Sequence, residues 1–205
     1  MARIKRETFV TPKGTAVYPW LNKPDTKFSP EGEYKVTLKI PTSEAEDLIS
    51  RLTGIAEDYH QELIKTDPKS KHLRMNFPWE EEMDDQGNVT GNYLFKFKQK
   101  ANITGKDGSS YSMNVALFDA KRNPSSSLVG GGSEIKVAAT VWPYKMNSTK
   151  TVGLSLKPTA VQIINLVSVG GGSAASMFND EDGFVEDIKT PSEVYVDDTA
   201  EACDF

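Results

Sequence analysis

Large apolar and basic side chains alternate one by one between residues 93 and 100. Because successive side chains of a β-strand point to opposite faces, this pattern predicts a strand with one apolar and one basic face. The apolar face carries Tyr93, Phe95 and Phe97, and the basic face carries Lys96, Lys98 and Lys100. A row of evenly spaced cations suits a ligand with evenly spaced negative charges, and single-stranded nucleic acid is the obvious candidate. The alternative is a half-exposed strand whose lysines only keep it soluble.

Further strands are expected on both sides of this central strand. Residues 33–40 alternate in the same way, and the other β-rich stretches are residues 15–18, 111–118, 135–142, 152–156 and 160–169. One helix is expected over residues 43–65, where apolar residues recur at three- and four-residue spacing after a capping box formed by Ser43 and Glu46. Residues 66–92 are interpreted as a long polar connection.

About six short strands with glycine-rich turns, and one helix between the second and third strands, are typical of a small barrel or sandwich. The basic strand face favours the OB-fold, a five- to six-stranded Greek-key barrel. The predicted fold is therefore mainly β, with one α-helix and a disordered acidic C-terminal tail.

The charge of the chain is unevenly distributed. The net charge is −5, but residues 179–205 carry ten acidic residues and one basic residue, a net −9, which leaves +4 for residues 1–178. Such an asymmetry suggests nucleic-acid contact and an interaction tail. The predicted parts are a basic N-terminal arm (residues 1–7), an OB-fold domain (8–169), a Gly/Ser hinge (170–178) and an acidic disordered tail (179–205).

The sequence contains no arrangement typical of catalysis. His60 and His72 have no cysteine or histidine nearby at metal-ligand spacing, and Cys203 has no neighbouring activating base. The acidic run Glu80–Asp85 lacks the EF-hand pattern and is interpreted as a solvated loop, with binding of a hard cation as the alternative. We therefore expect a non-enzymatic protein with no cofactor, no metal, no signal peptide and no membrane span.

Two aromatic residues follow the apolar set of residues 135–141. Counting by twos along the strand places Trp142 and Tyr144 on its polar face, beside Lys145. Aromatic rings on a basic strand face form a platform for stacking of bases, which contributes about 1–3 kcal/mol per base and tolerates any sequence. Trp142 could instead fill the end of the barrel, and both interpretations stay open.

The chain ends with an aromatic residue after an acidic run. A terminal Phe among acids offers an anchor for a hydrophobic pocket rimmed by basic residues. The predicted partner-binding residues are Asp197, Asp198, Glu201, Asp204 and Phe205. A tail that only improves solubility would explain the acids but not the final Phe.

Short motifs spread along the chain are similar to those of one protein family. They are Gly14-Thr15-Ala16, Lys23-Pro24-Asp25, Tyr34-Lys35-Val36, Ile40-Pro41, Phe95-Lys96-Phe97-Lys98, Gly130-Gly131-Gly132-Ser133, Lys136-Val137, Pro143-Tyr144-Lys145 and the terminal Asp204-Phe205. In this order and spacing they resemble the single-stranded DNA-binding proteins of T7-type bacteriophages, over about residues 8–170 plus the tail.

The resemblance implies an OB-fold that coats single-stranded DNA during phage DNA replication, recombination and repair, and that promotes strand annealing. It also implies a homodimer in the cytoplasm of the infected bacterial host, and a tail that binds the phage DNA polymerase and the helicase-primase. Lys96, Lys98, Tyr144 and Lys145 match family positions associated with DNA contact. We add Lys100, Trp142, the basic loop residues Lys69, Lys71 and Arg74, and Lys5 of the arm as DNA-binding residues.

Two other functions are compatible with the same residues. One is a protein–protein adaptor with an OB-like barrel and no DNA role, for which the basic face of residues 96–100 would be covered or ion-paired. The other is an RNA-binding chaperone, because the 2′-OH that distinguishes RNA is recognised by local contacts that the sequence does not place.

Overall fold

The computed structural model describes residues 6–27, 29–105 and 107–167. The chain divides into two units, Met1–Gly172 and Ser173–Phe205, and all described residues belong to the first. Most of the predicted basic arm, including Lys5, lies outside the described residues, as do the predicted hinge and acidic tail.

The described residues form eleven strands, one α-helix and one 3-10 helix, which confirms the mainly β prediction. In chain order the elements are β1 (Thr8–Val10), β2 (Gly14–Asp25), β3 (Glu33–Pro41), α1 (Thr42–Thr66), the 3-10 helix η1 (Pro68–His72), β4 (Arg74–Asn76), β5 (Trp79–Met83), β6 (Val89–Lys100), β7 (Asn102–Thr104), β8 (Ser110–Ser112), β9 (Ala116–Phe118), β10 (Glu134–Met146) and β11 (Thr151–Asn165).

Five long strands close into a barrel. Each pairs with the next in the order β2, β3, β6, β11, β10, and β10 pairs again with β2. If the five strands are counted along the chain, this order is 1-2-3-5-4-1, a Greek key. Two junctions are short, since β6 meets β11 only at Phe97 and Leu156, and β10 meets β2 at two residue pairs. This partly open barrel confirms the predicted OB-fold.

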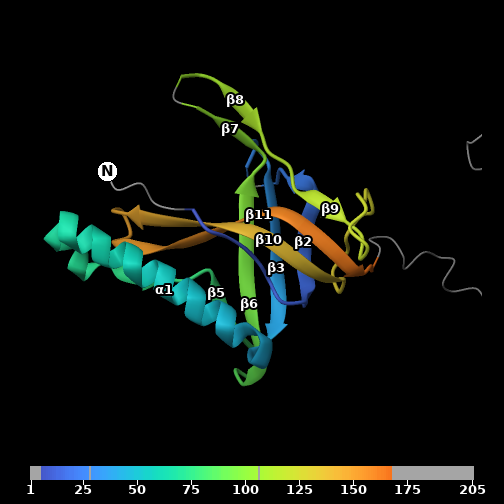
Figure 1. Cartoon of the computed structure of the whole chain (residues 1–205), viewed down its shortest axis with the longest axis horizontal. Coiled ribbons are helices and arrows are strands. Elements are labelled where there is room, and N and C mark those ends of the chain that lie inside the picture. The colour runs from blue at the N-terminus through green and yellow to red at the C-terminus, as the bar shows by residue number, and fades with distance from the viewer. Residues whose placement is uncertain (1–5, 28, 106, 168–205) are drawn as a thin grey trace, which may run out of the picture. The chain divides into compact units, whose positions relative to one another are not determined.

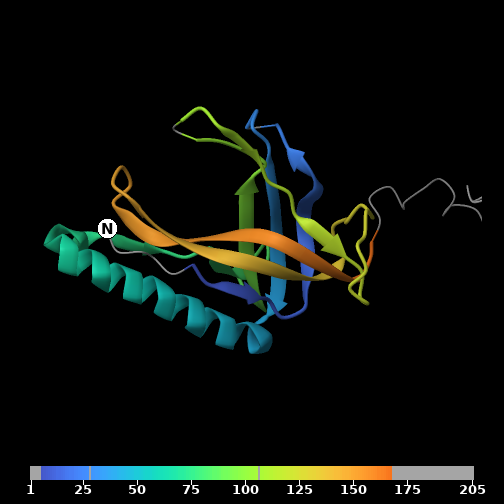
Figure 2. The same cartoon turned by 45° about the horizontal axis from the view of Figure 1, so that its top comes forward.

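The apolar face of each barrel strand points inward. Phe95 and Phe97 of β6 are fully buried, as the alternation of residues 93–100 predicts, and they pack with inward residues of β3 and β11. Helix α1 runs along one side of the barrel (Figures 1 and 2). Its apolar stripe joins the same core through Ala45, Leu48, Leu52 and Ala56. One continuous core therefore holds the barrel and its helix together.

The helix lies where it was predicted, but the predicted capping box is absent. Helix α1 begins at Thr42, with extended Pro41 as the N-cap and no side-chain hydrogen bond at that end. Ser43 is therefore inside the first turn, where its backbone is already helical, and it cannot act as the cap. Proline is well suited to this boundary because it ends β3 and has no N–H to satisfy.

The predicted boundaries of several strands were wrong. Prolines were taken as strand breakers, yet β2 continues through Pro19 and Pro24, and β11 continues through Pro158 where two shorter strands were expected. Register shifts near Pro19, Pro24 and Pro158 accommodate the irregular backbone. By contrast, the single strand predicted over residues 111–118 is divided between β8 and β9.

The segment of residues 66–92 is not the long polar connection that was predicted. It contains η1, β4 and β5, and β5 pairs with β6 in antiparallel orientation. The acidic run of residues 80–85 therefore starts on a strand rather than in a solvated loop. This strand escaped recognition because its acidic residues are consecutive and lack the alternating apolar residues that mark a half-buried strand.

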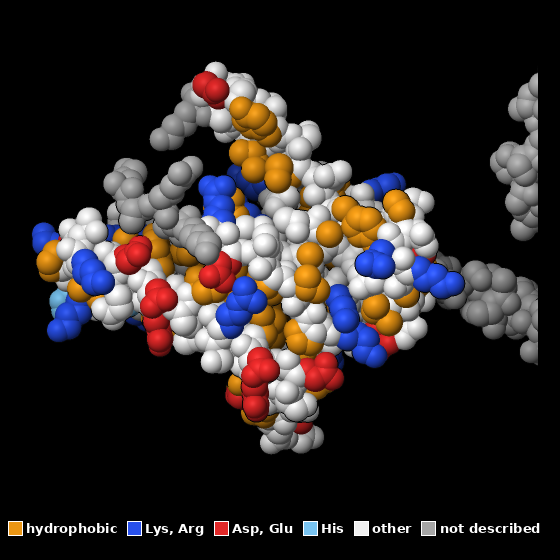
Figure 3. All heavy atoms as spheres, viewed as in Figure 1, with side chains coloured by type: hydrophobic (Ala, Val, Ile, Leu, Met, Phe, Trp, Pro, Cys, Tyr) orange, Lys and Arg blue, Asp and Glu red, His pale blue; other side chains and the backbone are white. Residues whose placement is uncertain are grey.

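A hairpin of β7 and β8 projects from the barrel (Figures 1 and 2). It carries exposed Ile103 and Tyr111, with Met113 just beyond it. On the face shown in Figure 3, hydrophobic side chains gather on this hairpin, whereas basic and acidic side chains are interspersed over the barrel. No single basic patch dominates this face.

Candidate nucleic-acid interface

The predicted basic row lies on the outer face of the barrel. Lys96 and Lys98 are exposed on β6, on the side opposite its buried phenylalanines. The pairing of Phe97 with Leu156 places the neighbours of Leu156 on the same outer face as these lysines. One of these neighbours is Lys157, so β6 and β11 together present a basic outer surface.

Two adjoining cavities, of about 590 and 740 Å3, hollow this surface. Both are lined by Lys98, Trp142, Ser155 and Lys157, so they form one continuous depression over β6, β11 and β10, which we call the groove. The first cavity continues toward Tyr144, and the second toward Lys100 and Arg6. An elongated, open, basic groove with aromatic walls matches the shape and chemistry of a single nucleic-acid strand.

Trp142 lies in the middle of the groove between two cations. The guanidinium carbon of Arg6 and the Nζ of Lys157 each lie 3.6 Å from the centre of its ring. The ring of Trp142 thus contacts two cationic side chains. Burial, together with the nearby charge of Arg6, lowers the pKa of Lys157. Trp142 is therefore neither a core plug nor an open stacking platform in this state.

Tyr144 lines the groove near the end of β10. Its hydroxyl oxygen accepts a hydrogen bond from the Nδ2 of Asn76. Asn76 is close because β4 pairs with β11 at Gly153, where an added Cβ would lie 2.1 Å from the carbonyl oxygen of Asn76. The absent side chain at position 153 thus allows the contact that orients the tyrosine ring.

Two lysines of the basic row form ion pairs. The Nζ of Lys96 lies 2.8 Å from Glu80, and the Nζ of Lys100 lies 2.5 Å from Glu31. All four side chains are about half exposed, so these pairs are surface ion pairs. Lys98 has no ion pair within the described part of the chain, and it lines both cavities of the groove.

Lys145 points away from the groove. Its Nζ lies 3.1 Å from Asp67 and 3.0 Å from the hydroxyl of Ser70, so it ties β10 to η1. The hydrogen bond from Lys145 is the main cause that lowers the pKa of Asp67. In this position Lys145 has a structural partner and does not line the groove.

The other predicted residues lie beside the groove or beyond the described chain. Lys69 and Lys71 are exposed on η1, and Arg74 is exposed on β4, but none of the three lines the groove. Lys5, like the tail residues 197–205, belongs to the part that the structure does not describe.

Sequence reasoning missed two groove residues, Arg6 and Lys157. Lys157 precedes Pro158, and the predicted break in the strand hid its place on the outer face. In a continuous β11, successive side chains point to opposite faces, so Lys157, the residue after buried Leu156, points outward. The alternation of residues 152–157 was therefore the available signal. Arg6 had no such signal, because its position depends on its contact with the ring of Trp142, far along the chain.

Other chemistry finds little support in the described residues. No group of three or more His, Cys, Asp or Glu side chains is placed to hold a metal ion there. The Nε2 of His60 lies 2.9 Å from the carbonyl oxygen of Ser70, a contact between α1 and η1. Among the helices of this part, none has the length and apolar character needed to cross a membrane.

Known proteins are similar to this chain in both sequence and fold. Residues 13–166 match the family model described as "Single-stranded DNA-binding protein, Bacteriophage T7". The chain is 26% identical to the single-stranded DNA-binding protein of Enterobacteria phage T3, across 84% of this chain and 82% of the relative. It is 27% identical to that of Escherichia phage T7, across 82% of this chain and 79% of the relative.

Solved structures agree with the sequence matches. The crystal structure of gp2.5, a single-stranded DNA-binding protein encoded by bacteriophage T7, has a TM-score of 0.68 at 25% identity, covering 89% of this chain and 100% of that one. The single-stranded DNA-binding protein of bacteriophage Enc34 in complex with ssDNA has a TM-score of 0.52 at 14% identity, covering 78% and 88%, a likeness of fold alone. The fold, the basic groove and the match over residues 13–166 lead to one conclusion: the chain belongs to the family of single-stranded DNA-binding proteins of bacteriophage T7.

Proposed function

We propose that this protein binds and coats single-stranded DNA during phage DNA replication, recombination and repair, and promotes annealing of complementary strands. The observation that carries the proposal is the continuous groove, in which Lys98 faces the aromatic residues Trp142 and Tyr144. Stacking tolerates any base and lysines neutralise phosphates, so such a groove binds a single strand without sequence preference. Duplex DNA, whose bases are already stacked, offers much less to these rings.

The ion pairs of the basic row are compatible with this role. Pairs between exposed side chains contribute only about 0–1 kcal/mol each, so a phosphate can replace the carboxylate at little cost. Lys96 and Lys100 would then exchange Glu80 and Glu31 for the backbone of the DNA. Arg6 and Lys157 would move from the ring of Trp142 to phosphates as a base stacks on the ring.

We infer further that the acidic tail regulates this groove. Residues 179–205 carry −9 and residues 1–178 carry +4, so the tail can compete with DNA for the basic surface. DNA would displace it and release Phe205 to bind the phage DNA polymerase and the helicase-primase, in the cytoplasm of the infected host. The proposal includes a homodimer, and it assigns residues 8–169 to DNA binding and residues 170–178 to a hinge.

Fluorescence anisotropy with labelled oligo-dT and with labelled duplex, across a salt series, tests the DNA-binding proposal. We expect salt-sensitive binding to oligo-dT, quenching of tryptophan fluorescence, and much weaker binding to duplex. Deleting residues 179–205 should tighten binding at low salt and abolish recruitment of the polymerase. Absence of binding by both the full chain and the deletion variant would overturn the proposal.

The adaptor remains the second candidate because two of its three expected ion-paired lysines are paired. It predicts that the full chain captures replication proteins while neither form binds nucleic acid. Parallel titrations with oligo-dT and oligo-U separate DNA coating from an RNA chaperone, since the groove chemistry is shared and only contacts to the 2′-OH would differ.

A further inference from the structure

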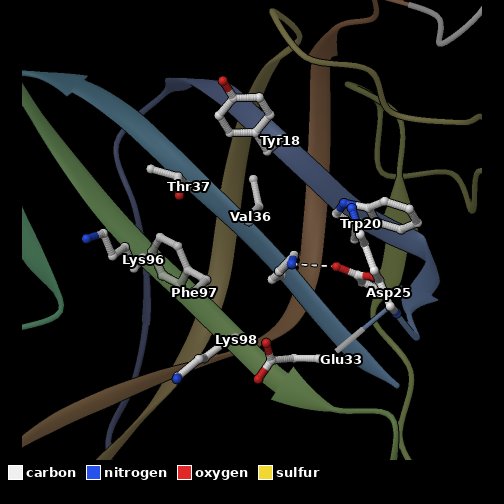
Figure 4. A pocket seen from close by; sticks show the side chains of 11 residues that line it. Tyr18, Trp20, Asp25, Glu33, Val36, Thr37, Lys96, Phe97 and Lys98 are labelled. Atoms are coloured by element: carbon white, nitrogen blue, oxygen red, sulfur yellow. Dashed lines mark hydrogen bonds and ion pairs between the residues drawn. The ribbon is translucent and has the colours of Figure 1, made fainter. Parts of the chain in front are cut away.

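A third depression, of about 500 Å3, lies next to the groove over β2, β3 and β6. Lys96 and Lys98 line both this depression and the groove, so the two surfaces are continuous. Figure 4 shows Tyr18 and Trp20 projecting from β2 at the side opposite the lysines of β6. None of the residues that were predicted to stack lies here, and no role has yet been given to these two rings.

The pairing of the strands places Trp20 in register with the basic row. Trp20 is opposite Lys35 in the pairing of β2 with β3, and Lys35 is opposite Lys98 in the pairing of β3 with β6. Residues that are directly opposite share one face, so these three side chains form a row across three strands. Two strand spacings, about 10 Å, separate the ends of this row.

Tyr18 is the most exposed large hydrophobic side chain in the described chain, at 82%. Its backbone has a φ of 49°, in the left-handed region that residues other than Gly, Asn and Asp rarely adopt. It lies at the register shift between Val17 and Trp20, a bulge that turns its ring outward. An aromatic ring held in solvent by a costly backbone conformation is a sign of function rather than of packing.

The charged side chains that line this depression are partly paired, and Lys98 stays exposed where the depression meets the groove. Asp25 accepts a hydrogen bond from the Nζ of Lys35 at 2.5 Å, and both residues line the depression. The carboxylate is almost buried and neutralised by this pair, whereas Lys98 at the opposite side is exposed. Glu33 also lines the depression, at the end nearest Lys100.

We propose that Tyr18 and Trp20 form a second base-stacking position, where the single strand that leaves the groove past Lys98 continues across β3 onto β2. This inference rests on the proposed function, because it extends the path of the same ligand. The occupant follows from the continuity of the two surfaces and from the cation at their junction. The DNA strand would thus stack on both sides of the basic row, with its phosphates over β6.

A variant with Trp20 as its only tryptophan tests the contact directly. The chain has three tryptophans, and Trp79→Phe together with Trp142→Phe leaves Trp20 alone while keeping an aromatic ring at both other positions. Anisotropy of labelled oligo-dT reports binding, and quenching at saturation reports stacking on Trp20. Saturable binding with quenching supports the inference, and binding without quenching overturns it while leaving the proposed function intact. Failure of the wild-type protein to bind would instead overturn the proposed function.

Affinities for oligo-dT of increasing length, from about 4 to about 16 nucleotides, locate the contact along the strand. Tyr18→Ala and Trp20→Ala should each bind the longer oligonucleotides about 5-fold or more weakly, and the shortest ones almost normally. Trp20→Phe should restore most of the affinity, which a structural role of the indole would not predict. Met83→Ala, at a similarly exposed position on β5 outside all three depressions, is the matched control. Equal affinities of the Tyr18 and Trp20 variants and this control at every length would overturn the inference.

Discussion

One alternating sequence produces both the inner and the outer face of β6, but different parts of the chain supply the residues that each face contacts. On the inner face, Phe95 and Phe97 are buried in a core to which every barrel strand contributes. On the outer face, Lys96 is paired with Glu80 and Lys98 is open, a difference set by one acid on β5. Burial makes the inner face rigid, whereas the partners of the outer face can be exchanged. The fold therefore depends on one face, and the proposed DNA binding depends on the other.

Removing an inner ring should have the largest effect. Phe95→Ala deletes a fully buried ring whose centre lies 6.0 Å from the ring centre of Trp79. It should lower the free energy of unfolding by about 3–5 kcal/mol. Urea denaturation followed by circular dichroism measures this loss. Lys98→Ala, on the other face of the same strand, should change stability by less than about 0.5 kcal/mol. Similar losses for the two variants would contradict the division between the faces.

Tyr144→Ala should have the next largest effect, on binding rather than stability. Loss of one stacking ring should weaken the affinity for oligo-dT by about 1–3 kcal/mol, measured by anisotropy. Tyr144→Phe keeps the ring and loses only the hydrogen bond with Asn76, so it should bind almost as well as the wild type. If the Phe variant is as weak as the Ala variant, the hydroxyl contact rather than the ring supports binding.

A comparison of Lys98, which lines the groove, with Lys145, which points away from it, separates ligand contact from structural support. Lys98→Met should reduce the slope of log affinity against log salt by about 0.7, the value for one phosphate contact with a single strand. Lys145→Met should leave the slope unchanged, because its ammonium is held by Asp67 and Ser70 outside the groove. Equal reductions in both variants would show that Lys145 also reaches the DNA.

Releasing a paired lysine should have a smaller effect, in the opposite direction. Glu80→Gln removes the competitor of Lys96 and should tighten binding to oligo-dT at low salt by up to about 1 kcal/mol. The gain should disappear at high salt, where the pair is screened. Unchanged affinity at low salt would indicate that Lys96 does not contact phosphate.

The smallest effect is expected from pH. The hydrogen bond from Lys35 is the main cause that lowers the pKa of Asp25. A lowered folded-state pKa gives stability that is present above the unfolded value, about 3.9, and is lost as pH falls through the folded value. The wild type should therefore lose more stability than Asp25→Asn between neutral pH and about pH 3, as measured by urea midpoints. Parallel losses in the two proteins would contradict this assignment.

The inner face could be predicted from the sequence because burial leaves a periodic pattern. Alternation alone located β3 and β6, and apolar spacing located the stripe of α1. The strands β2 and β11 were recognised only in part, because the prolines within them are tolerated at bulges that depend on the neighbouring strand. Barrel closure supplies the context that local propensity lacks.

For the outer face, the sequence predicted which residues lie there but not which residues they contact. Local alternation places Lys96 and Lys145 on predicted strands. Their carboxylate partners, at positions 80 and 67, belong to a segment that was interpreted as a loop. The cations around Trp142 and the exposed ring of Tyr18 also depend on long-range pairing or on a bulge. Sequence patterns record burial well and record side-chain partners poorly.

The close approach at Gly153 limits what evolution can change near the groove. Any side chain there would push Asn76, and with it β4, away from β11. A library that randomises position 153 and is selected for growth of a phage that depends on the protein should return glycine almost alone. Position 10, exposed on β1 and outside all three depressions, should accept many residues in the same library. The most invariant position of this surface is then one that has no side chain to touch the ligand.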